Sequence, residues 1–369
     1  MKLSTQQNTL VSVLQEASKF LSSRSSVPSL AGFHLVAESS GMLHIRASSG
    51  VTTLVRRIPA QVEEEGEILL PGGVFLQALK SLESGELSLS LEGGLLIIQQ
   101  KKTRFEVAPL DLEAFPAIES YDGWTKMLLP NEMFMNSVRQ VLVAAGVDET
   151  KPVLTGVLME LKQPNALVTT DGFRLFRVQA DLATDIDSSL LVPAKSLRDL
   201  LPMFEKVKDG IIQCYVPEDK SSIVITWPDG EAQVRTIQGE FPPYRSIIPE
   251  ACAFSFRVER EQLQQCLRQA MVFARDVSNI VVFEVRDGQL VMRSQKSVQG
   301  RSEVEMPISS LQGEPVRFAC NGRYVTEFIA SIEASEIIIQ GNEALKPVLF
   351  SVPENDSLLY LIMPFKLAE

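Results

Sequence analysis

Few side chains in this sequence have the types and spacing that catalysis needs. Histidine, the commonest general acid or base, occurs only at His34 and His44. Two histidines argue against a histidine-rich metal site and against histidine-dependent catalysis. The cysteines are far apart and form no Cys-x-x-Cys pair, which indicates buried free thiols in a reducing compartment. They are Cys214, Cys252, Cys266 and Cys320.

Motifs for nucleotide binding or hydrolysis are missing as well. The sequence contains no Gly-x-Gly-x-x-Gly, no phosphate-binding loop, no Gly-x-Ser-x-Gly and no His-Glu-x-x-His. The run Glu63-Glu64-Glu65 is typical of a solvated turn. We therefore predict no catalytic site, no metal and no cofactor, with an unrecognised carboxylate pair as the alternative.

Length and composition predict an ordinary globular protein of two or three domains. The chain has 369 residues, of which 45% are hydrophobic and 22% charged. It contains no run of about 18 apolar residues, so we predict no membrane span. The first residues lack the apolar core of a signal peptide, and a cytoplasmic location is expected. The net charge of −11 would by itself argue against nucleic-acid binding.

Three stretches share one layout, and internal repeats decide how such a chain is divided. Each stretch has a helix with apolar residues at i, i+4 and i+7, then an apolar strand that runs straight into a second helix, then a pair of alternating strands. The helical triplets are Leu10, Leu14 and Ala17; Val138, Leu142 and Ala145; and Leu263, Leu267 and Ala270. The paired strands turn at Gly93-Gly94, Asp229-Gly230 and Gly341-Asn342.

This period of about 125 residues predicts three domains of like fold. We place them at 1–121, 122–250 and 251–369. The expected fold class is α+β, with two helices packed on an antiparallel sheet in each domain. Short connections between the domains indicate a fixed arrangement.

The predicted helices differ from the rest of the chain in charge. They span 6–21, 74–82, 131–146, 194–208, 260–275 and 322–333, and together they contain eleven basic and seven acidic residues. A net positive helical layer in an acidic chain would suit loose, sequence-independent contact with a phosphate backbone. The alternative is that these charges are simply solvated helix faces.

Four segments, in order, resemble the bacterial DNA sliding clamp, the β subunit of DNA polymerase III. They are Thr169–Leu175, Phe241–Pro249, Tyr360–Pro364 and, more weakly, Ser22–Leu30. The resemblance covers the whole chain. It implies the DNA-clamp fold, in which two chains close a six-domain ring that encircles duplex DNA, slides, and acts as a processivity factor in DNA replication. Such a protein belongs to a DNA-directed DNA polymerase complex, but the loader hydrolyses the nucleotide and the polymerase forms the bond.

The resemblance also implies three kinds of site. Arg24 aligns with a DNA-contacting arginine, and helix position adds Lys80, Arg139, Lys195, Arg198, Arg268, Arg275 and Arg323 as DNA-binding candidates. The loop 148–153 departs from the family pattern, which has polar or aromatic residues before the position of Leu154.

The second implied site is a pocket that binds a short linear motif, roughly Gln followed by apolar and aromatic residues. Polymerases, the clamp loader and repair proteins would carry that motif. The matching positions are Leu154, Thr170, Gly172, Phe173, Arg174, Leu175, Pro242, Ser246, Ile247, Leu361, Ile362, Met363, Pro364 and Phe365. Family members often have arginine at the positions of Ser246 and Lys366, so motif preference can differ here.

The third implied site is the dimer interface. Phe105 and Val107 match one side, and Val272 and Phe273 match the other. Basic residues near the first side (Lys101, Lys102, Arg104) could face Glu303 and Glu305 across this interface. Two further hypotheses stay open from sequence: a scaffold of the same fold that binds peptides but not DNA, and a specialised second clamp copy that confers inhibitor resistance.

Overall fold

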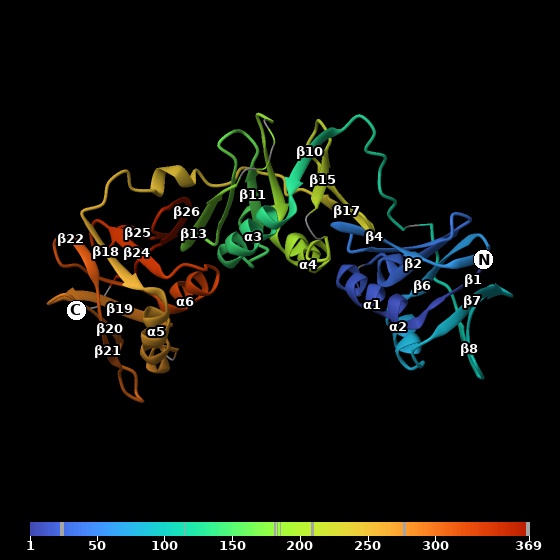
Figure 1. Cartoon of the computed structure of the whole chain (residues 1–369), viewed down its shortest axis with the longest axis horizontal. Coiled ribbons are helices and arrows are strands. Elements are labelled where there is room, and N and C mark those ends of the chain that lie inside the picture. The colour runs from blue at the N-terminus through green and yellow to red at the C-terminus, as the bar shows by residue number, and fades with distance from the viewer. Residues whose placement is uncertain are drawn as a thin grey trace. The chain divides into compact units, whose positions relative to one another are not determined.

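The structure is a computed structural model that describes residues 1–22, 26–113, 115–180, 182, 184, 186–207, 210–275 and 278–366. Its elements repeat three times along the chain (Figure 1). The first third contains β1 (Lys2–Gln6), α1 (Gln7–Ala17), β2 (Gly32–Glu38), β3 (Met42–Ser48), β4 (Thr52–Pro59), β5 (Gln61–Glu64), β6 (Gly66–Pro71), α2 (Gly72–Lys80), β7 (Glu86–Glu92), β8 (Leu95–Gln100) and β9 (Thr103–Val107).

The other two thirds follow the same order, except that the described residues of the central third form four strands between the two helices instead of five. The central third contains β10 (Thr125–Pro130), α3 (Asn131–Val141), β11 (Gly156–Glu160), β12 (Ala166–Thr170), β13 (Arg174–Gln179), β14 (Ser189–Pro193), α4 (Ala194–Phe204), β15 (Ile211–Val216), β16 (Ser222–Trp227) and β17 (Gly230–Arg235). The last third contains β18 (Phe254–Glu259), α5 (Arg260–Ala274), β19 (Ile280–Arg286), β20 (Gln289–Ser294), β21 (Glu303–Pro307), β22 (Ser309–Gly313), β23 (Arg317–Asn321), α6 (Gly322–Ala330), β24 (Glu336–Gly341), β25 (Val348–Val352) and β26 (Asn355–Ile362).

These elements confirm the predicted repeat. All six predicted helices form, and each begins directly after a strand. The three predicted hairpins form too, as β7–β8, β16–β17 and β24–β25. Every strand pair is antiparallel, as an α+β fold with segregated helices requires.

The chain forms two compact units whose limits do not follow the repeats. One unit comprises Met1–Asn131 and Asp199–Thr236, and the other comprises Glu132–Arg198 and Ile237–Glu369. The central third therefore contributes to both units. The boundaries predicted from sequence, at 121/122 and 250/251, stay a prediction.

Main-chain hydrogen bonds carry each large sheet across a repeat boundary. In the first unit, β17 pairs with β4 inside an eight-stranded sheet of order β10-β15-β16-β17-β4-β3-β2-β6. In the second unit, β13 pairs with β26 inside a nine-stranded sheet of order β14-β11-β12-β13-β26-β25-β24-β18-β22. The remaining sheets have the orders β5-β1-β7-β8-β9 and β21-β20-β19-β23, so β9 and β21 are edge strands. Sequence patterns did not predict that the large sheets cross the boundaries.

One polar side chain at the start of each repeat's first helix binds the end of its second helix. Nε2 of Gln7 donates to the Leu79 carbonyl at 2.8 Å, and Nδ2 of Asn131 donates to the Phe204 carbonyl at 2.9 Å. In the last repeat, Nη1 of Arg260 donates to the Ile332 carbonyl at 3.5 Å. Carbonyls at helix ends lack intrahelical partners, so these bonds fix the two helices of each repeat to one another.

Candidate functional site

A tight turn between β12 and β13 presents Phe173 to solvent. The Gly172 N–H donates to Oγ1 of Thr170 at 3.0 Å, and this hydroxyl donates to the Arg174 carbonyl at 2.6 Å. Oδ1 of Asp171 accepts the N–H groups of Phe173 and Arg174 at 2.9 and 3.0 Å. Gly172 has φ +92°, a conformation that favours glycine. The Phe173 side chain at this turn is 57% exposed.

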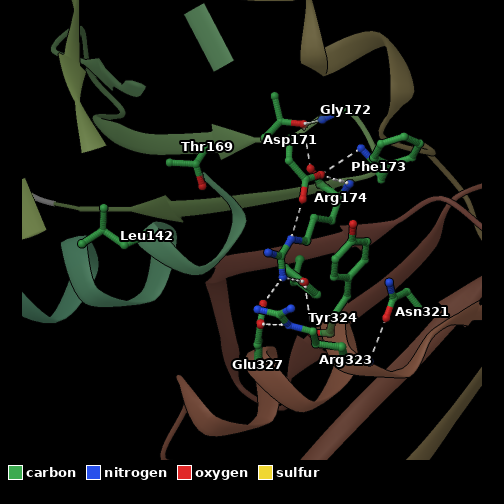
Figure 2. A network of polar contacts seen from close by, with 12 residues as sticks. Leu142, Thr169, Asp171, Gly172, Phe173, Arg174, Asn321, Arg323, Tyr324 and Glu327 are labelled. Atoms are coloured by element: carbon green, nitrogen blue, oxygen red, sulfur yellow. Dashed lines mark hydrogen bonds and ion pairs between the residues drawn. The ribbon is translucent and has the colours of Figure 1, made fainter. Parts of the chain in front are cut away.

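The Arg174 side chain turns away from solvent and toward helix α6, as Figure 2 shows. Its Nε donates to Oδ2 of Asp171 at 2.9 Å, and its Nη1 donates to Oε2 of Glu327. The guanidinium carbon lies 4.1 Å from the centre of the Tyr324 ring, a cation–π geometry. Burial alone disfavours the charged form, but Tyr360, Glu327 and Asp171 outweigh it and raise the Arg174 pKa.

The same turn is joined to the C-terminal strand. Leu175 lies opposite Leu361 in the β13–β26 ladder, and the Met363 N–H donates to the Phe173 carbonyl at 2.8 Å. Leu175 and Leu361 belong to one apolar cluster with Tyr244, and Met363 packs against that cluster. The structure therefore brings together three of the predicted pocket segments, 170–175, 241–248 and 361–363.

An open hollow of about 570 Å³ lies beside this cluster. Its wall contains three of the predicted pocket residues, Ser246, Ile247 and Met363. The rest of its lining is Ile248, Pro249, Asn342, Glu343, Leu345, Lys346 and Pro347. The loop after Gly341 was expected only as a hairpin turn, so its part in the hollow was missed. The one available signal was Leu345, a large apolar residue in the turn, which is 53% exposed.

Other predicted pocket residues lie elsewhere in the same unit. Leu361 and Ile362 are fully buried in the sheet, and Thr170 is buried under the turn. Leu154 is half-buried in the short helical turn Pro152–Thr155, where its carbonyl accepts the Gly146 N–H at 2.8 Å. Pro242 is exposed, and Pro364 and Phe365 are half-buried. The Phe365 N–H donates to the Ala319 carbonyl at 2.7 Å, which fixes the end of the described chain.

The predicted DNA-binding cations that the structure describes all lie on helices or at helix ends, and all are exposed. These are Lys80, Arg139, Lys195, Arg198, Arg268, Arg275 and Arg323. Arg24 lies outside the described residues. Arg323 is paired with Glu327 at 2.7 Å, and Nη1 of Arg139 donates to Oδ1 of Asn136 at 3.2 Å.

The predicted dimer-interface residues lie at or beside edge strands. Phe105 and Val107 are on β9, half-buried and buried respectively. Val272 and Phe273 are at the end of α5, and Val272 is 62% exposed. A methyl group added to Gly300 would lie 3.1 Å from the Phe273 ring, so this ring packs directly against the loop that leads into β21.

The part of the chain that the structure describes contains neither a candidate metal site nor a candidate membrane-spanning helix. No group of three or more His, Cys, Asp or Glu side chains there could hold a metal ion. Within the same residues, no helix is both long enough and apolar enough to cross a membrane.

Three α+β repeats whose sheets continue from one repeat to the next define a protein of the DNA-clamp class. Models of the DNA polymerase III beta subunit match residues 1–119 as its N-terminal domain, 128–243 as its central domain and 245–366 as its C-terminal domain. The chain belongs to the DNA polymerase III beta subunit family.

Relatives support this assignment over their full length. The beta sliding clamp of Bacillus subtilis (strain 168) is 25% identical over 99% of this chain and 100% of its own. That of Synechocystis sp. is 27% identical, with 100% of both chains covered. Solved clamp structures from Bacillus subtilis and Thermotoga maritima match the fold with TM-scores of 0.93 and 0.91, at 22% and 26% identity, and cover 100% of both chains. A Pseudomonas aeruginosa clamp bound to griselimycin also matches, with a TM-score of 0.91 at 20% identity over 100% of both chains.

The predicted fold class and function are thereby confirmed. As a member of this family, the chain is a DNA polymerase processivity factor in DNA replication, and the subunit is non-catalytic. The indication from net charge alone, against nucleic-acid binding, does not hold, because the family implies DNA and polymerase partners.

Proposed function

We propose that two copies of this chain associate head to tail into a six-domain ring. The ring encircles duplex DNA and slides along it. It tethers polymerases, the clamp loader and repair proteins through the pocket on each chain. The ring holds DNA by topology more than by affinity, which is why an acidic chain can serve. The observation that carries this proposal is a common register at the two junctions between repeats.

The two junctions are the β4–β17 and β13–β26 pairings, and the residues on one side of each have equivalents in all three repeats. Strands β6, β14 and β23 each end where a helix begins, so Leu69, Leu191 and Ala319 are equivalent. From each of these residues a path leads across the sheet through directly opposite residues of neighbouring strands. The paths are Leu69–His34–Arg46–Val55, Leu191–Leu158–Val168–Arg177 and Ala319–Val282–Arg293–Glu303. Val55, Arg177 and Glu303 are therefore equivalent positions.

The residues on the other side of each junction also have equivalents in all three repeats. Lys2, Lys126 and Ser255 are equivalent, because β1, β10 and β18 also run directly into helices. The paths are Lys2–Ser90–Ile97–Glu106, Lys126–Tyr215–Val224–Gln233 and Ser255–Gln340–Leu349–Leu361. Glu106, Gln233 and Leu361 are therefore equivalent positions.

Both junctions inside the chain then obey one rule. Val55 lies opposite Glu231, two residues before Gln233, and Arg177 lies opposite Leu359, two residues before Leu361. Applied to the edge strands β21 and β9, the rule sets Glu303 opposite Arg104 of a second copy. A strand edge with unpaired N–H and C=O groups is a ready template for such pairing.

This register matches opposite charges at three exposed positions. It pairs Arg104 with the partner's Glu303, Lys102 with the partner's Glu305, and Glu106 with the partner's Arg301. It also sets Val107 opposite the partner's Gly300, which packs on Phe273. The proposed register thus puts predicted charges and the predicted apolar residue Val107 in one interface, as a specific interface requires.

The helical cations are the proposed DNA contacts. Arg24, Lys80, Arg139, Lys195, Arg198, Arg268, Arg275 and Arg323 would meet phosphates without reading sequence, so contact should weaken with salt. The exposed Phe173 and the neighbouring hollow form the proposed peptide pocket. Its mixed lining of apolar side chains and of polar ones (Ser246, Asn342, Glu343 and Lys346) suits a short motif of Gln followed by apolar and aromatic residues. We keep 1–121, 122–250 and 251–369 as the proposed domain limits.

Charge reversal tests the ring directly. The variants Arg104→Glu and Glu303→Arg each place like charges at both interfaces of a homodimer, which disfavours association. An equal mixture of the two variants restores opposite charges at both interfaces. We expect light scattering to show weakened dimers for each variant alone and a dimer of twice 40.8 kDa for the mixture. The control Lys101→Glu, one position out of phase, should dimerise normally. Failure of the mixture to recover would contradict the register.

DNA retention tests the function. The wild-type ring, loaded by a clamp loader, should stay on nicked circular DNA and slip off the linearised form. Equal retention on both forms, or a monomeric wild-type protein, would contradict topological binding and favour the peptide-scaffold hypothesis.

A further inference from the structure

The carboxylate of Glu327 on helix α6 joins two sets of residues. Its Oε2 accepts Nη1 of Arg174, and its Oε1 accepts Nε of Arg323 at 2.7 Å (Figure 2). Glu327 also lines an open hollow of about 520 Å³ whose other walls include Arg139, Gln140 and Glu333. The Glu327 carboxylate is thus accessible from this hollow, although its partner Arg174 is buried.

Arg174 depends on this carboxylate. Its side chain is 9% exposed, and a guanidinium at that depth requires a paired negative charge. Asp171 supplies one partner, but Asp171 also holds the N–H groups of Phe173 and Arg174 with its other oxygen. If Glu327 were neutral, Asp171 would be the one negative charge left beside Arg174 among the described partners, and a stronger pull on it would come at the expense of the turn.

The 171–173 turn also anchors Met363, which forms part of the pocket wall. The Phe173 carbonyl accepts the Met363 N–H at 2.8 Å, and Met363 lines the hollow with Ser246 and Ile247. A continuous path therefore leads from Glu327 through Arg174 and Asp171 to Phe173, and from there to Met363. Every link in this path is a hydrogen bond.

We propose that Glu327 is a positioning residue for the peptide pocket: through Arg174 it holds the 171–173 turn, which presents Phe173 and anchors Met363. This inference rests on the proposed pocket. It assigns to a helix outside the pocket the control of the pocket's shape.

The test compares two substitutions that remove the same charge from the same hollow. In Glu327→Gln the acceptor for Arg174 becomes neutral, whereas in Glu333→Gln the charge is lost without a change near Arg174. Hydrogen–deuterium exchange of the segment 170–175 reads the turn without any ligand. We expect the exchange of the Phe173 and Arg174 amides to speed up about tenfold in Glu327→Gln and to stay at the wild-type rate in Glu333→Gln. Unchanged exchange in Glu327→Gln would overturn the proposal.

Binding of a fluorescein-labelled hexapeptide, Gln followed by apolar and aromatic residues, reads the pocket. We expect about tenfold weaker binding by Glu327→Gln and unchanged binding by Glu333→Gln. Faster exchange with unchanged affinity would refute the positioning role. If the wild-type protein fails to bind the peptide, the proposed pocket fails, while the exchange result still decides the role of Glu327 at the turn.

A further variant guards against general unfolding. Glu327→Asp keeps the negative charge, so exchange and affinity should lie closer to the wild type than in Glu327→Gln. An equal loss in both variants, together with a lowered melting temperature, would indicate a merely structural role and contradict the proposal.

Discussion

Asn131 holds in the central repeat the position that Gln7 holds in the first, and both amides bind the end of the repeat's second helix. Nε2 of Gln7 contacts the carbonyls of Leu79 and Leu82, and Nδ2 of Asn131 contacts those of Phe204 and Val207. The residues preceding them differ, yet the backbone N–H groups also match: Gln7 donates to the Gly85 carbonyl and Asn131 to that of Gly210. The repeat is thus preserved in hydrogen bonds.

Replacing this amide should destabilise the first unit. Asn131→Asp keeps the size of the side chain but removes both N–H donors and sets a carboxylate against two carbonyls. Because the site is buried, we expect a loss of about 1–3 kcal/mol in the free energy of unfolding. Urea denaturation measures it. The exposed Asn8, changed to Asp, is the control and should unfold almost like the wild type.

Arg56 should be the most costly arginine to remove from the first unit. Its side chain is 2% exposed and pairs with Glu16 and, at 2.6 Å, with Asp229 of the central repeat. Arg56→Met removes the hydrogen bonds of a buried guanidinium, although Glu16 keeps Lys206 as a partner, so it should cost about 1–3 kcal/mol. The neighbouring Arg57, which is more exposed, should cost less than half as much when changed to Met. Similar urea midpoints for the two variants would contradict this ranking.

Phe273→Glu should yield monomers. The ring packs against Gly300 beside the proposed partner strand, and a carboxylate there would be buried without a counter-charge. Light scattering at micromolar concentration would show the change. Phe173→Glu, an equally drastic substitution on an exposed phenylalanine of the same unit, should remain dimeric. A persistent Phe273→Glu dimer would contradict the interface.

Deleting 363–369 should abolish binding of the motif peptide and leave the dimer intact. Met363 lines the hollow, whereas Leu361 and Ile362 are buried in β26 and pair with β13. The deletion must therefore begin after Ile362, because a larger one would remove part of the sheet. Fluorescence anisotropy measures peptide binding. Unchanged affinity would mean that the pocket is assigned to the wrong place.

The pair between Glu327 and Arg174 should give stability that depends on pH. Burial raises the Glu327 pKa, but hydrogen bonds and charges from Arg174 and Arg323 outweigh it and hold the pKa below its ordinary value of 4.5. Since the folded pKa is the lower one, the stabilisation is fully present above about pH 4.5 and is lost as the pH falls further. The melting temperatures of wild type and Glu327→Gln should therefore differ at pH 6 and draw closer together as the pH falls below 4.5. A constant difference would contradict this assignment.

Local patterns were sufficient to predict the helices, the hairpins and their threefold recurrence. Periodicity and turn residues act over a few positions, so the segments around Leu10 and Gly93 could be read directly. The direction of the Arg174 side chain could not, because its partner Glu327 lies 153 residues away. The share of Leu345 in the hollow also depends on which segments the sheet brings together. The pairing of β17 with β4 was missed for the same reason. The alternation of apolar and polar residues in a strand does not indicate which other strand will pair with it.

Strand pairing across the repeat boundaries makes the covalent connections there dispensable. Between β9 and β10 the described residues form no helix or strand, and between β17 and β18 they form only the short helical turn Tyr244–Ile247. A protease that nicked either segment would leave two fragments still joined by the β4–β17 or β13–β26 ladder. The nicked protein should migrate as one species under native conditions. It should separate into its two fragments only in denaturant, which breaks the strand pairing between them.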